Sequence, residues 1–376
     1  MAKEKIEKQE QTTPEQQLET YLKNNKEDHY NFEEIKTHVI SSGSLILDTA
    51  MSSGLRTGTV FRASGVTSGG KTSCSLSFMK NFLETVPNSR GILIKSEGRL
   101  SHEVAERSGV VLTEDYTAWK DGTCFIYKTN IYESAISLIR NLVKSNSSKK
   151  VYFFLIDSMD SLCPRGDIDR PFEEAGKVAG AALLTSDFLR KMALAFTSMG
   201  HVCMMISQVR STIKINPYEK TAPQITNASG GSAALHYSDW ILEFQPRFNK
   251  DIIWEGEEGK SKRLGHFCKV VFRKSVNEKD GVECKYPIIY GRTRGTSIWT
   301  EMEILDMIKM WQLVEVTARG GWLTFQQTFI DEIKKECNFD LPEKIQGDTA
   351  FLKILEENKG ITKYLVEKFK KLTTQD

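Results

Sequence analysis

One short segment, SGVTSGGKTSC at residues 64–74, limits the possible folds of this chain more than any other. It combines three glycines, a lysine and several small hydroxylated residues, which suits a tight backbone turn and not a hydrophobic core. Apolar spacing predicts a strand directly before it (58–64) and a helix directly after it (71–86). A glycine-rich turn between a strand and a helix is typical of α/β proteins with a parallel sheet.

This segment fits the phosphate-binding pattern G-x-x-x-x-G-K-[ST]. In such a loop the glycines let consecutive backbone N–H groups point at phosphate oxygens, at the positive end of the next helix. Lys71 would reach the β- and γ-phosphates, and the Thr72 hydroxyl would bind Mg²⁺. An accidental match is disfavoured by the strand and helix on either side. The residues expected to bind the nucleoside triphosphate are Gly65, Val66, Thr67, Ser68, Gly69, Gly70, Lys71, Thr72 and Ser73.

Polar residues also stand at the ends of three apolar strands. Asp157 follows the run VYFFLI, where a carboxylate is costly unless it faces a polar site, so we expect it to bind the nucleotide's Mg²⁺. Glu97 ends the strand 91–97 and could deprotonate a water that attacks the γ-phosphorus. Gln208 directly follows the strand 202–207 and could sense the γ-phosphate. For Glu97 and Gln208, an ordinary solvated strand end is the alternative.

The remainder of the chain alternates strands with helices up to about residue 240, which predicts a parallel sheet. Further strands are expected at 124–129, 151–158 and 202–207, and further helices at 133–145 and 177–200. The segments DWILEF, HFCKVVF and YPIIYGR then follow without helices between them, which predicts an antiparallel extension. We expect three parts: an N-terminal tail and docking segment (1–40) with a helix at 14–24, a core (41–296), and a small α+β domain (297–376). The last part is expected to contain helices near 300–313, 349–358 and 361–371.

Composition narrows the classes of function. Lys and Arg number 51 against 49 Asp and Glu, so any surface that binds nucleic acid must be local. The seven cysteines include no C-x-x-C pair, which argues against a zinc site or a disulfide framework. No apolar run is long enough to span a membrane, and the charged N-terminus is unlike a secretory signal. An intracellular protein without membrane contact is expected.

Taken in order, several segments resemble the RecA-type homologous recombinases. LIKSEGRLSHEVAERSGV is similar to the segment with that family's catalytic glutamate, FFLIDSMDSLCP to its metal-binding strand, and MMISQVRSTI to its γ-phosphate sensor. NASGGSAALHYSDWILEF is similar to the end of its second DNA-binding loop, and the segments 302–325 and 345–372 are similar to the C-terminal domain of bacterial members. The resemblance covers about residues 40–372. Divergence elsewhere points to the phage-encoded, T4-type branch, and thus to a bacterial cytoplasm, the host's if the chain is phage-encoded.

Some positions depart from the bacterial pattern. Lys95 stands where bacterial members tend to have an acid, two residues before the expected catalytic glutamate. Ser101 and Val104 replace the acidic and aromatic residues that help to hold adenine. Leu235 and His236 replace a lysine and a phenylalanine at the contact between protomers. These departures concern the adenine contacts and the protomer interface.

The resemblance implies a RecA-like P-loop ATPase core whose mostly parallel sheet has an antiparallel extension. It makes Glu97 the catalytic base and Gln208 the ATP sensor. It also implies that Lys274, or its neighbour Arg273, just beyond the strand 266–272, supplies a cation to the nucleotide of the adjacent protomer; a solvated strand end is the alternative. The implied activity is a DNA-dependent ATPase that uses ATP and Mg²⁺, forms helical filaments on single-stranded DNA and pairs it with homologous duplex DNA. Single-strand-binding and mediator proteins are implied partners.

The same resemblance assigns two long loops, 163–178 and 210–231, to single-stranded DNA. Without it, flexible surface loops would be the default interpretation. The residues expected to bind DNA are Val178, Arg190, Arg210, Ile213, Lys214, Lys220, Gly230, Gly231 and Ser232.

Two other functions stay open. A ring helicase shares the core fold but usually has a separate N-terminal domain, whereas only about 40 residues precede the core here. A mediator that binds ATP but hydrolyses it poorly is disfavoured by the presence of Lys71, Glu97 and Gln208.

Overall fold

The computed structural model describes residues 13–26, 28–31, 37–168, 170–171, 180–209, 231–317 and 321–373. The chain forms two units, residues 1–36 and residues 37–376. In the first unit, helix α1 (Pro14–Asn24) begins with a capping box, in which Thr13 and Gln16 exchange hydrogen bonds between side chain and backbone. This helix is confirmed as predicted. Two of its apolar side chains, Leu18 and Tyr21, are more than half exposed.

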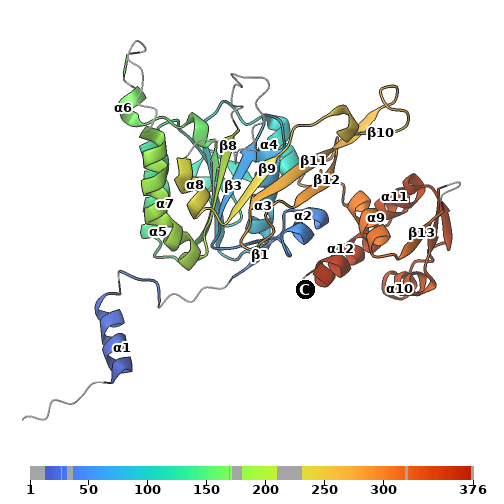
Figure 1. The fold of residues 1–376 in the computed structure, drawn as a ribbon, viewed down its shortest axis with the longest axis horizontal. Coiled ribbons are helices and arrows are strands. Elements are labelled where there is room, and N and C mark those ends of the chain that lie inside the picture. The colour runs from blue at the N-terminus through green and yellow to red at the C-terminus, as the bar shows by residue number, and fades with distance from the viewer. Residues whose placement is uncertain are drawn as a thin grey trace, which may run out of the picture. The chain divides into compact units, whose positions relative to one another are not determined.

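The second unit is built on a ten-stranded sheet of order β10-β11-β9-β3-β8-β7-β4-β6-β5, with β12 paired to β11 (Figure 1). Its strands are β3 (Val60–Gly65), β4 (Ser89–Lys95), β5 (Leu112–Thr113), β6 (Cys124–Lys128), β7 (Val151–Asp157), β8 (Val202–Gln208), β9 (Trp240–Phe244), β10 (Ile252–Trp254), β11 (Arg263–Lys274) and β12 (Glu283–Ile289). The strands from β9 through β3 to β5 are parallel, while β10, β11 and β12 form antiparallel pairs. The predicted α/β fold with an antiparallel extension is confirmed.

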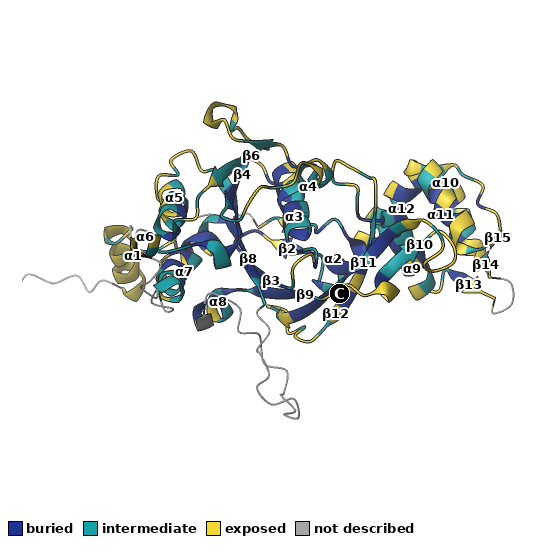
Figure 2. Ribbon diagram, turned by 90° about the horizontal axis from the view of Figure 1, so that it is seen from above, coloured by how far each residue is buried: buried dark blue, intermediate teal, exposed yellow. Residues whose placement is uncertain are grey.

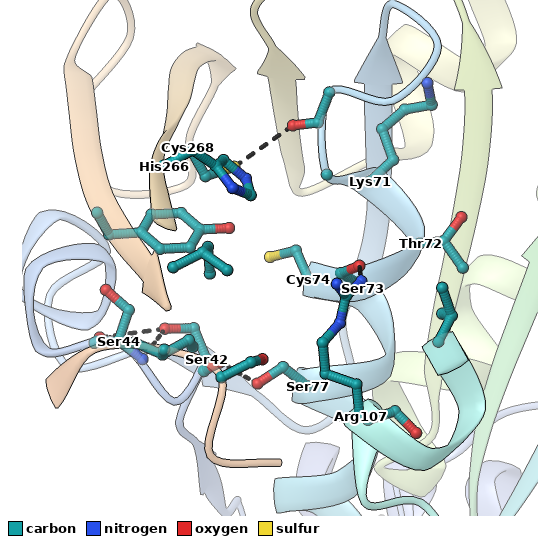
Figure 3. A pocket seen from close by; sticks show the side chains of 18 of the residues that line it. Ser42, Ser44, Lys71, Thr72, Ser73, Cys74, Ser77, Arg107, His266 and Cys268 are labelled. Atoms are coloured by element: carbon teal, nitrogen blue, oxygen red, sulfur yellow. Dashed lines mark hydrogen bonds between the residues drawn. The ribbon is translucent and has the colours of Figure 1, made fainter. Parts of the chain in front are cut away.

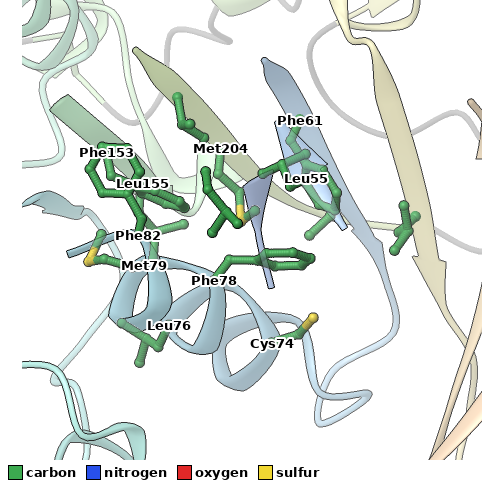
Figure 4. Packing of buried hydrophobic residues seen from close by; sticks show 14 of the residues in the cluster. Leu55, Phe61, Cys74, Leu76, Phe78, Met79, Phe82, Phe153, Leu155 and Met204 are labelled. Carbon is green, nitrogen blue, oxygen red and sulfur yellow. The ribbon is translucent and has the colours of Figure 1, made fainter. Parts of the chain in front are cut away.

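Helices cover both faces of the sheet, and this explains the unbroken apolar run of β7. Phe153 and Leu155 pack against α3 (Lys71–Thr85), where the rings of Phe82 and Phe153 lie 5.3 Å apart (Figure 4). The alternate residue Phe154 packs with the side chains of α5 (Tyr132–Lys144) and α7 (Gly180–Met199) on the other face. Successive strand residues point to opposite faces, so a strand that is covered twice needs apolar residues at every position. Figure 2 shows these buried strands between helices with exposed outer surfaces.

Several short elements complete the core. They are β1 (Val39–Ile40), α2 (Leu45–Ala50), β2 (Leu55–Arg56), α4 (His102–Ser108), α6 (Arg165–Ile168), α8 (Gly231–Tyr237) and single 3₁₀ turns at Tyr116–Ala118, Met159–Ser161 and Asn249–Asp251. Apolar periodicity needs more residues than these elements have, and the sequence did not predict them. Among the described residues, no helix combines the length and apolar character that crossing a bilayer requires.

The C-terminal elements surround a third hydrophobic cluster, which includes Ile304, Phe325, Phe351 and Leu365 and which Leu45 of α2 joins. They are α9 (Thr300–Met310), β13 (Val314–Val316), β14 (Trp322–Phe325), α10 (Gln327–Cys337), β15 (Lys344–Gln346), α11 (Asp348–Glu357) and α12 (Lys359–Thr373), with the three strands in one antiparallel sheet. Three of these helices confirm the sequence prediction: α9, α11 and α12 correspond to the helices expected near 300–313, 349–358 and 361–371. Helix α10 was not predicted. Residues 37–376 form a single compact unit. The division of this unit at residue 297 is therefore not tested and stays a prediction.

A buried carboxyl group ties α9 to α2. Glu303 accepts a hydrogen bond from the Ser44 hydroxyl and, at 3.0 Å, one from the Leu45 backbone N–H. Burial raises the pKa of Glu303 to about 8, helped by nearby Asp48 and opposed by these hydrogen bonds. The folded chain therefore binds this proton more tightly than the unfolded chain does, and stability from this group falls as the pH rises from its ordinary pKa towards the raised one.

Replacing Glu303 by Gln tests this coupling. Between about pH 6 and about pH 8, the wild type should lose about 1–3 kcal/mol of unfolding free energy relative to E303Q, because only the wild type has to ionise a buried group. Urea unfolding at several pH values measures the difference. Glu301, on the same helix, forms ion pairs with Arg292 and Lys359 that lower its pKa against the effect of burial. E301Q is therefore a control whose stability difference from the wild type should stay flat in this range; a flat E303Q difference would contradict the prediction.

Candidate nucleotide site

The glycine-rich loop joins β3 to α3 in the predicted position. Gly65 and Gly70 have φ angles of +135° and +109°, which side chains rarely adopt. A Cβ atom at Gly65 would lie 2.3 Å from the Phe244 carbonyl oxygen, so the close approach of β9 also requires glycine. The Lys71 ammonium donates to the carbonyl oxygens of Gly65 (2.8 Å) and Val66 (2.7 Å), which holds it over the loop. Burial lowers its pKa, an effect that the nearby carboxylates oppose.

Asp157, at the end of β7, faces the start of α3. The Thr72 hydroxyl lies 3.4 Å from Asp157 Oδ2, and that same oxygen accepts a hydrogen bond from the Lys95 ammonium at 2.8 Å. A hydroxyl and a carboxylate at the mouth of a phosphate loop are hard oxygen ligands of the kind that Mg²⁺ prefers. The geometry therefore fits the predicted pair of metal ligands, Thr72 and Asp157.

Glu97 and Gln208 meet at the same edge of the sheet. Glu97 lies two residues beyond the end of β4, and its Oε1 accepts hydrogen bonds from the hydroxyls of Ser158 and Ser161 (2.7 Å for Ser161). The Gln208 amide nitrogen lies 3.3 Å from the same oxygen. Burial raises the pKa of Glu97, but the two serine hydroxyls and the nearby lysines outweigh it, so the net shift is downward. Glu97 is therefore held as a carboxylate, the form that a general base needs.

A cavity of about 350 Å³ opens beside the loop, between α3, α4 and the strands β11 and β12 (Figure 3). Arg107 extends from α4 and donates to the Ser73 hydroxyl at 2.9 Å. On the opposite wall, Arg247 donates to His266 Nε2 at 2.7 Å, and the other imidazole nitrogen lies 3.0 Å from the Tyr290 hydroxyl. Burial and the neighbouring arginines lower the pKa of His266 to about 4, so the ring is neutral and carries its proton on Nδ1. The cavity wall thus presents guanidinium, imidazole and phenol groups beside the phosphate loop.

The cations predicted to act across protomers lie elsewhere in the fold. Arg273 and Lys274 are the last residues of β11 and not beyond the strand, which corrects their predicted position. Arg273 forms an ion pair with Glu243, and the Lys274 ammonium donates to the carbonyl oxygens of Leu235 (2.8 Å) and His236 (2.9 Å). Lys274 therefore connects β11 to helix α8, which begins where the predicted second DNA loop ends. Its role towards a neighbouring protomer stays a prediction.

Little of the predicted DNA site falls within the described part of the chain. Arg190 lies on the exposed side of α7, where it pairs with Asp187 at 2.8 Å. Gly231 and Ser232 form the first residues of α8, and the turn α6 occupies part of the first loop. Val178, Arg210, Ile213, Lys214, Lys220 and Gly230 lie outside the described residues. The assignment of both loops to DNA stays a prediction.

Several site residues were missed by the sequence analysis. Ser158 and Ser161 hold Glu97, and Asp160 accepts the Gln208 backbone N–H at 2.7 Å. Their signal was present in the polar residues that follow the β7 run in IDSMDS. Arg247 and His266 carried no such signal, because only the pairing of β11 with β9 and β12 brings them beside the loop.

Fold and site together define a P-loop nucleotide-binding protein of the α/β class. Residues 22–292 match the family model of the RecA N-terminal domain, so the chain belongs to the RecA family. It is 25% identical to the protein RecA of Porphyromonas gingivalis, over 88% of this chain and 84% of that protein. It is also 25% identical to RecA of Mycobacteroides abscessus (88% and 86% covered) and 26% identical to RecA of Aquifex aeolicus (83% and 81%).

Replacing Thr72 by Val separates metal binding from nucleotide binding. The variant keeps the shape of the side chain but loses the hydroxyl beside Asp157, so ATP affinity in Mg²⁺ should fall about tenfold. Affinity in EDTA should hardly change, because the hydroxyl then has no metal to bind. Titration with a fluorescent ATP analogue measures both constants. A Ser77→Ala variant, which removes a different hydroxyl that lines the cavity, serves as control. If Thr72→Val lost ATP affinity equally in Mg²⁺ and in EDTA, the metal role of Thr72 would be contradicted.

Proposed function

We propose that this protein is a DNA-dependent ATPase that forms helical filaments on single-stranded DNA and catalyses homologous pairing and strand exchange in recombination and repair. One observation carries the proposal: the phosphate loop, the Thr72–Asp157 pair and the Glu97–Gln208 pair all lie at one edge of the sheet. Membership in the RecA family supports the same function. The low identity to the bacterial relatives and the departures at Lys95, Ser101 and Val104 support the phage-encoded branch.

Each side chain has a distinct role in the proposed hydrolysis of ATP. The loop amides and Lys71 bind the phosphates, and Lys71 would exchange its two loop carbonyls for phosphate oxygens. Glu97, held by two serine hydroxyls, orients and deprotonates the attacking water. Bound Mg²⁺ would supply charge neutralisation at the phosphates, with Thr72 and Asp157 as its protein ligands. Arg107 and the wall of the cavity would bind the remainder of the nucleotide.

Nucleotide state and DNA binding are proposed to be coupled through both ends of the second loop. Gln208 stands where that loop begins and donates to Glu97, while α8 stands where it ends and is held by Lys274. A change at the γ-phosphate can therefore pull on the loop through Gln208. Two carbonyl oxygens use two of the three donors of the Lys274 ammonium, so the third can serve a phosphate of the adjacent protomer.

Filament assembly is proposed to use the N-terminal unit. Helix α1 exposes Leu18 and Tyr21 and has no buried residue, so it is a suitable segment to dock on a neighbouring protomer. The nucleotide would then lie between protomers, with single-strand-binding and mediator proteins as further partners on DNA.

The first test measures ATP hydrolysis with and without single-stranded DNA. We expect turnover to increase at least about tenfold with DNA, because the active site is completed only when protomers assemble. Electron microscopy of the same samples should show helical filaments that require both ATP and DNA. Closed rings would favour a helicase instead, and a monomer that ignores oligonucleotides in saturating ATP and Mg²⁺ would overturn the proposal.

Replacing Glu97 by Gln tests the general base. The amide keeps the size of the side chain but cannot accept a proton, so turnover should fall about 10²- to 10⁴-fold while ATP affinity changes little. Steady-state turnover and nucleotide titration measure the two effects. Glu106→Gln, on the exposed side of the next helix, is the matched control. Unchanged turnover in Glu97→Gln would remove Glu97 from the mechanism.

A further inference from the structure

Lys95 occupies an unusual position for a lysine. It is the last residue of β4, and the strand register pairs it directly with Asp157, the last residue of β7. A backbone hydrogen bond of 3.0 Å, from the Ser96 N–H to the Asp157 carbonyl, holds the two strand ends together. The ammonium lies 2.8 Å from Asp157 Oδ2, and the side chains are only 10% and 5% exposed. The position of this cation is therefore set by the sheet and not by a flexible loop.

The partner of Lys95 is the oxygen that also faces Thr72. Asp157 Oδ2 receives the Lys95 ammonium on one side and has the Thr72 hydroxyl 3.4 Å away on the other. The pair is largely shielded from water, so its interaction is stronger than that of a surface ion pair. Lys95 is thus a fixed positive charge on the carboxylate that would bind Mg²⁺.

We propose that Lys95 is a built-in counter-ion of Asp157 which lowers the Mg²⁺ requirement of nucleotide binding. The inference rests on the proposed function, because it concerns the same nucleotide site. A bare carboxylate at Asp157 would repel the phosphates of a nucleotide, and Mg²⁺ would be needed to overcome that repulsion. Lys95 cancels the charge in advance, so part of the effect of the metal is supplied by the chain itself.

A second consequence concerns the metal alone. Lys95 and a metal ion would compete for the same carboxylate oxygen, and the ammonium would repel a divalent cation nearby. The wild type should therefore bind Mg²⁺ weakly until a nucleotide contributes its own oxygens. Lys95 acts through Asp157 and is a positioning residue for the metal–nucleotide complex.

The test compares ADP affinity in Mg²⁺ with ADP affinity in EDTA, for the wild type and for K95M. Using ADP separates the measurement from hydrolysis. In K95M, the loss of one positive charge should weaken ADP binding in both buffers. The negative charge of Asp157, which then has no ammonium partner, should weaken ADP binding further mainly in EDTA, because no Mg²⁺ is present there to neutralise it. The ratio of the two dissociation constants, EDTA over Mg²⁺, should therefore be about tenfold or more higher in K95M than in the wild type. A merely structural role would reduce both affinities equally and leave the ratio unchanged.

Two variants control for charge and for folding. K95R keeps the cation and should keep the wild-type ratio. Lys128 ends the neighbouring strand β6 in register with Lys95, but its ammonium pairs with the exposed carboxylate of Glu114 at 2.5 Å. K128M therefore removes the same charge from the next strand end and should also keep the wild-type ratio. If K95M does not fold, as judged by thermal unfolding, K95Q makes the same comparison, because its amide can donate to Asp157 without a charge.

Thermal unfolding with MgCl₂ alone gives a readout without nucleotide. At matched ionic strength, Mg²⁺ should raise the unfolding temperature of K95M more than that of the wild type, because Asp157 then lacks its ammonium partner. An unchanged dissociation-constant ratio in K95M overturns the role of Lys95 while nucleotide binding itself stands. A wild type that binds no ADP in either buffer overturns the proposed function instead.

Discussion

The carboxyl edge of a sheet that is covered on both faces is the constraint on which the candidate site depends. Within β4, β7 and β8, helices lie against both sides, so a charged group in the middle of these strands would be buried without water. In β3 the buried Arg62 is such a group, and its guanidinium donates to the Ser207 hydroxyl at 2.9 Å. Polar groups that are open to solvent or to a ligand therefore lie where the strands end. Parallel strands end together, and the phosphate loop, Asp157 and Gln208 consequently meet at one edge.

Charge balance at this edge is the second requirement. The carboxylates of Asp157 and Glu97 lie close to the ammonium groups of Lys71 and Lys95, and each carboxylate is also hydrogen-bonded. Buried charges of this kind are tolerated because they are paired, and removing one partner leaves the other exposed to a large desolvation cost. The site is therefore an electrostatic unit, and a nucleotide with its metal would have to exchange partners with these charged side chains.

The antiparallel extension connects this unit to other parts of the fold. Strand β11 forms one wall of the cavity through His266 and Cys268, and its last residue, Lys274, holds α8. Cys268 also donates to the Gly69 carbonyl in the phosphate loop at 3.4 Å. One long strand therefore contacts the phosphate loop, the cavity and the helix that follows the second predicted DNA loop.

Local chemistry made part of this protein predictable from its sequence. The glycine spacing of 65–72 specifies a strand–turn–helix unit, and an acid after the run VYFFLI specifies a polar strand end, because both depend only on neighbouring residues. Strand order and register are decided by packing between distant segments. Only the tertiary structure could therefore show that Lys95 pairs with Asp157 and that two serines donate to Glu97. The same holds for Arg247 and His266, which lie beside the phosphate loop, and for Lys274, which donates to carbonyl oxygens of α8. Those contacts join residues that are far apart in the chain, where no local pattern records the partner.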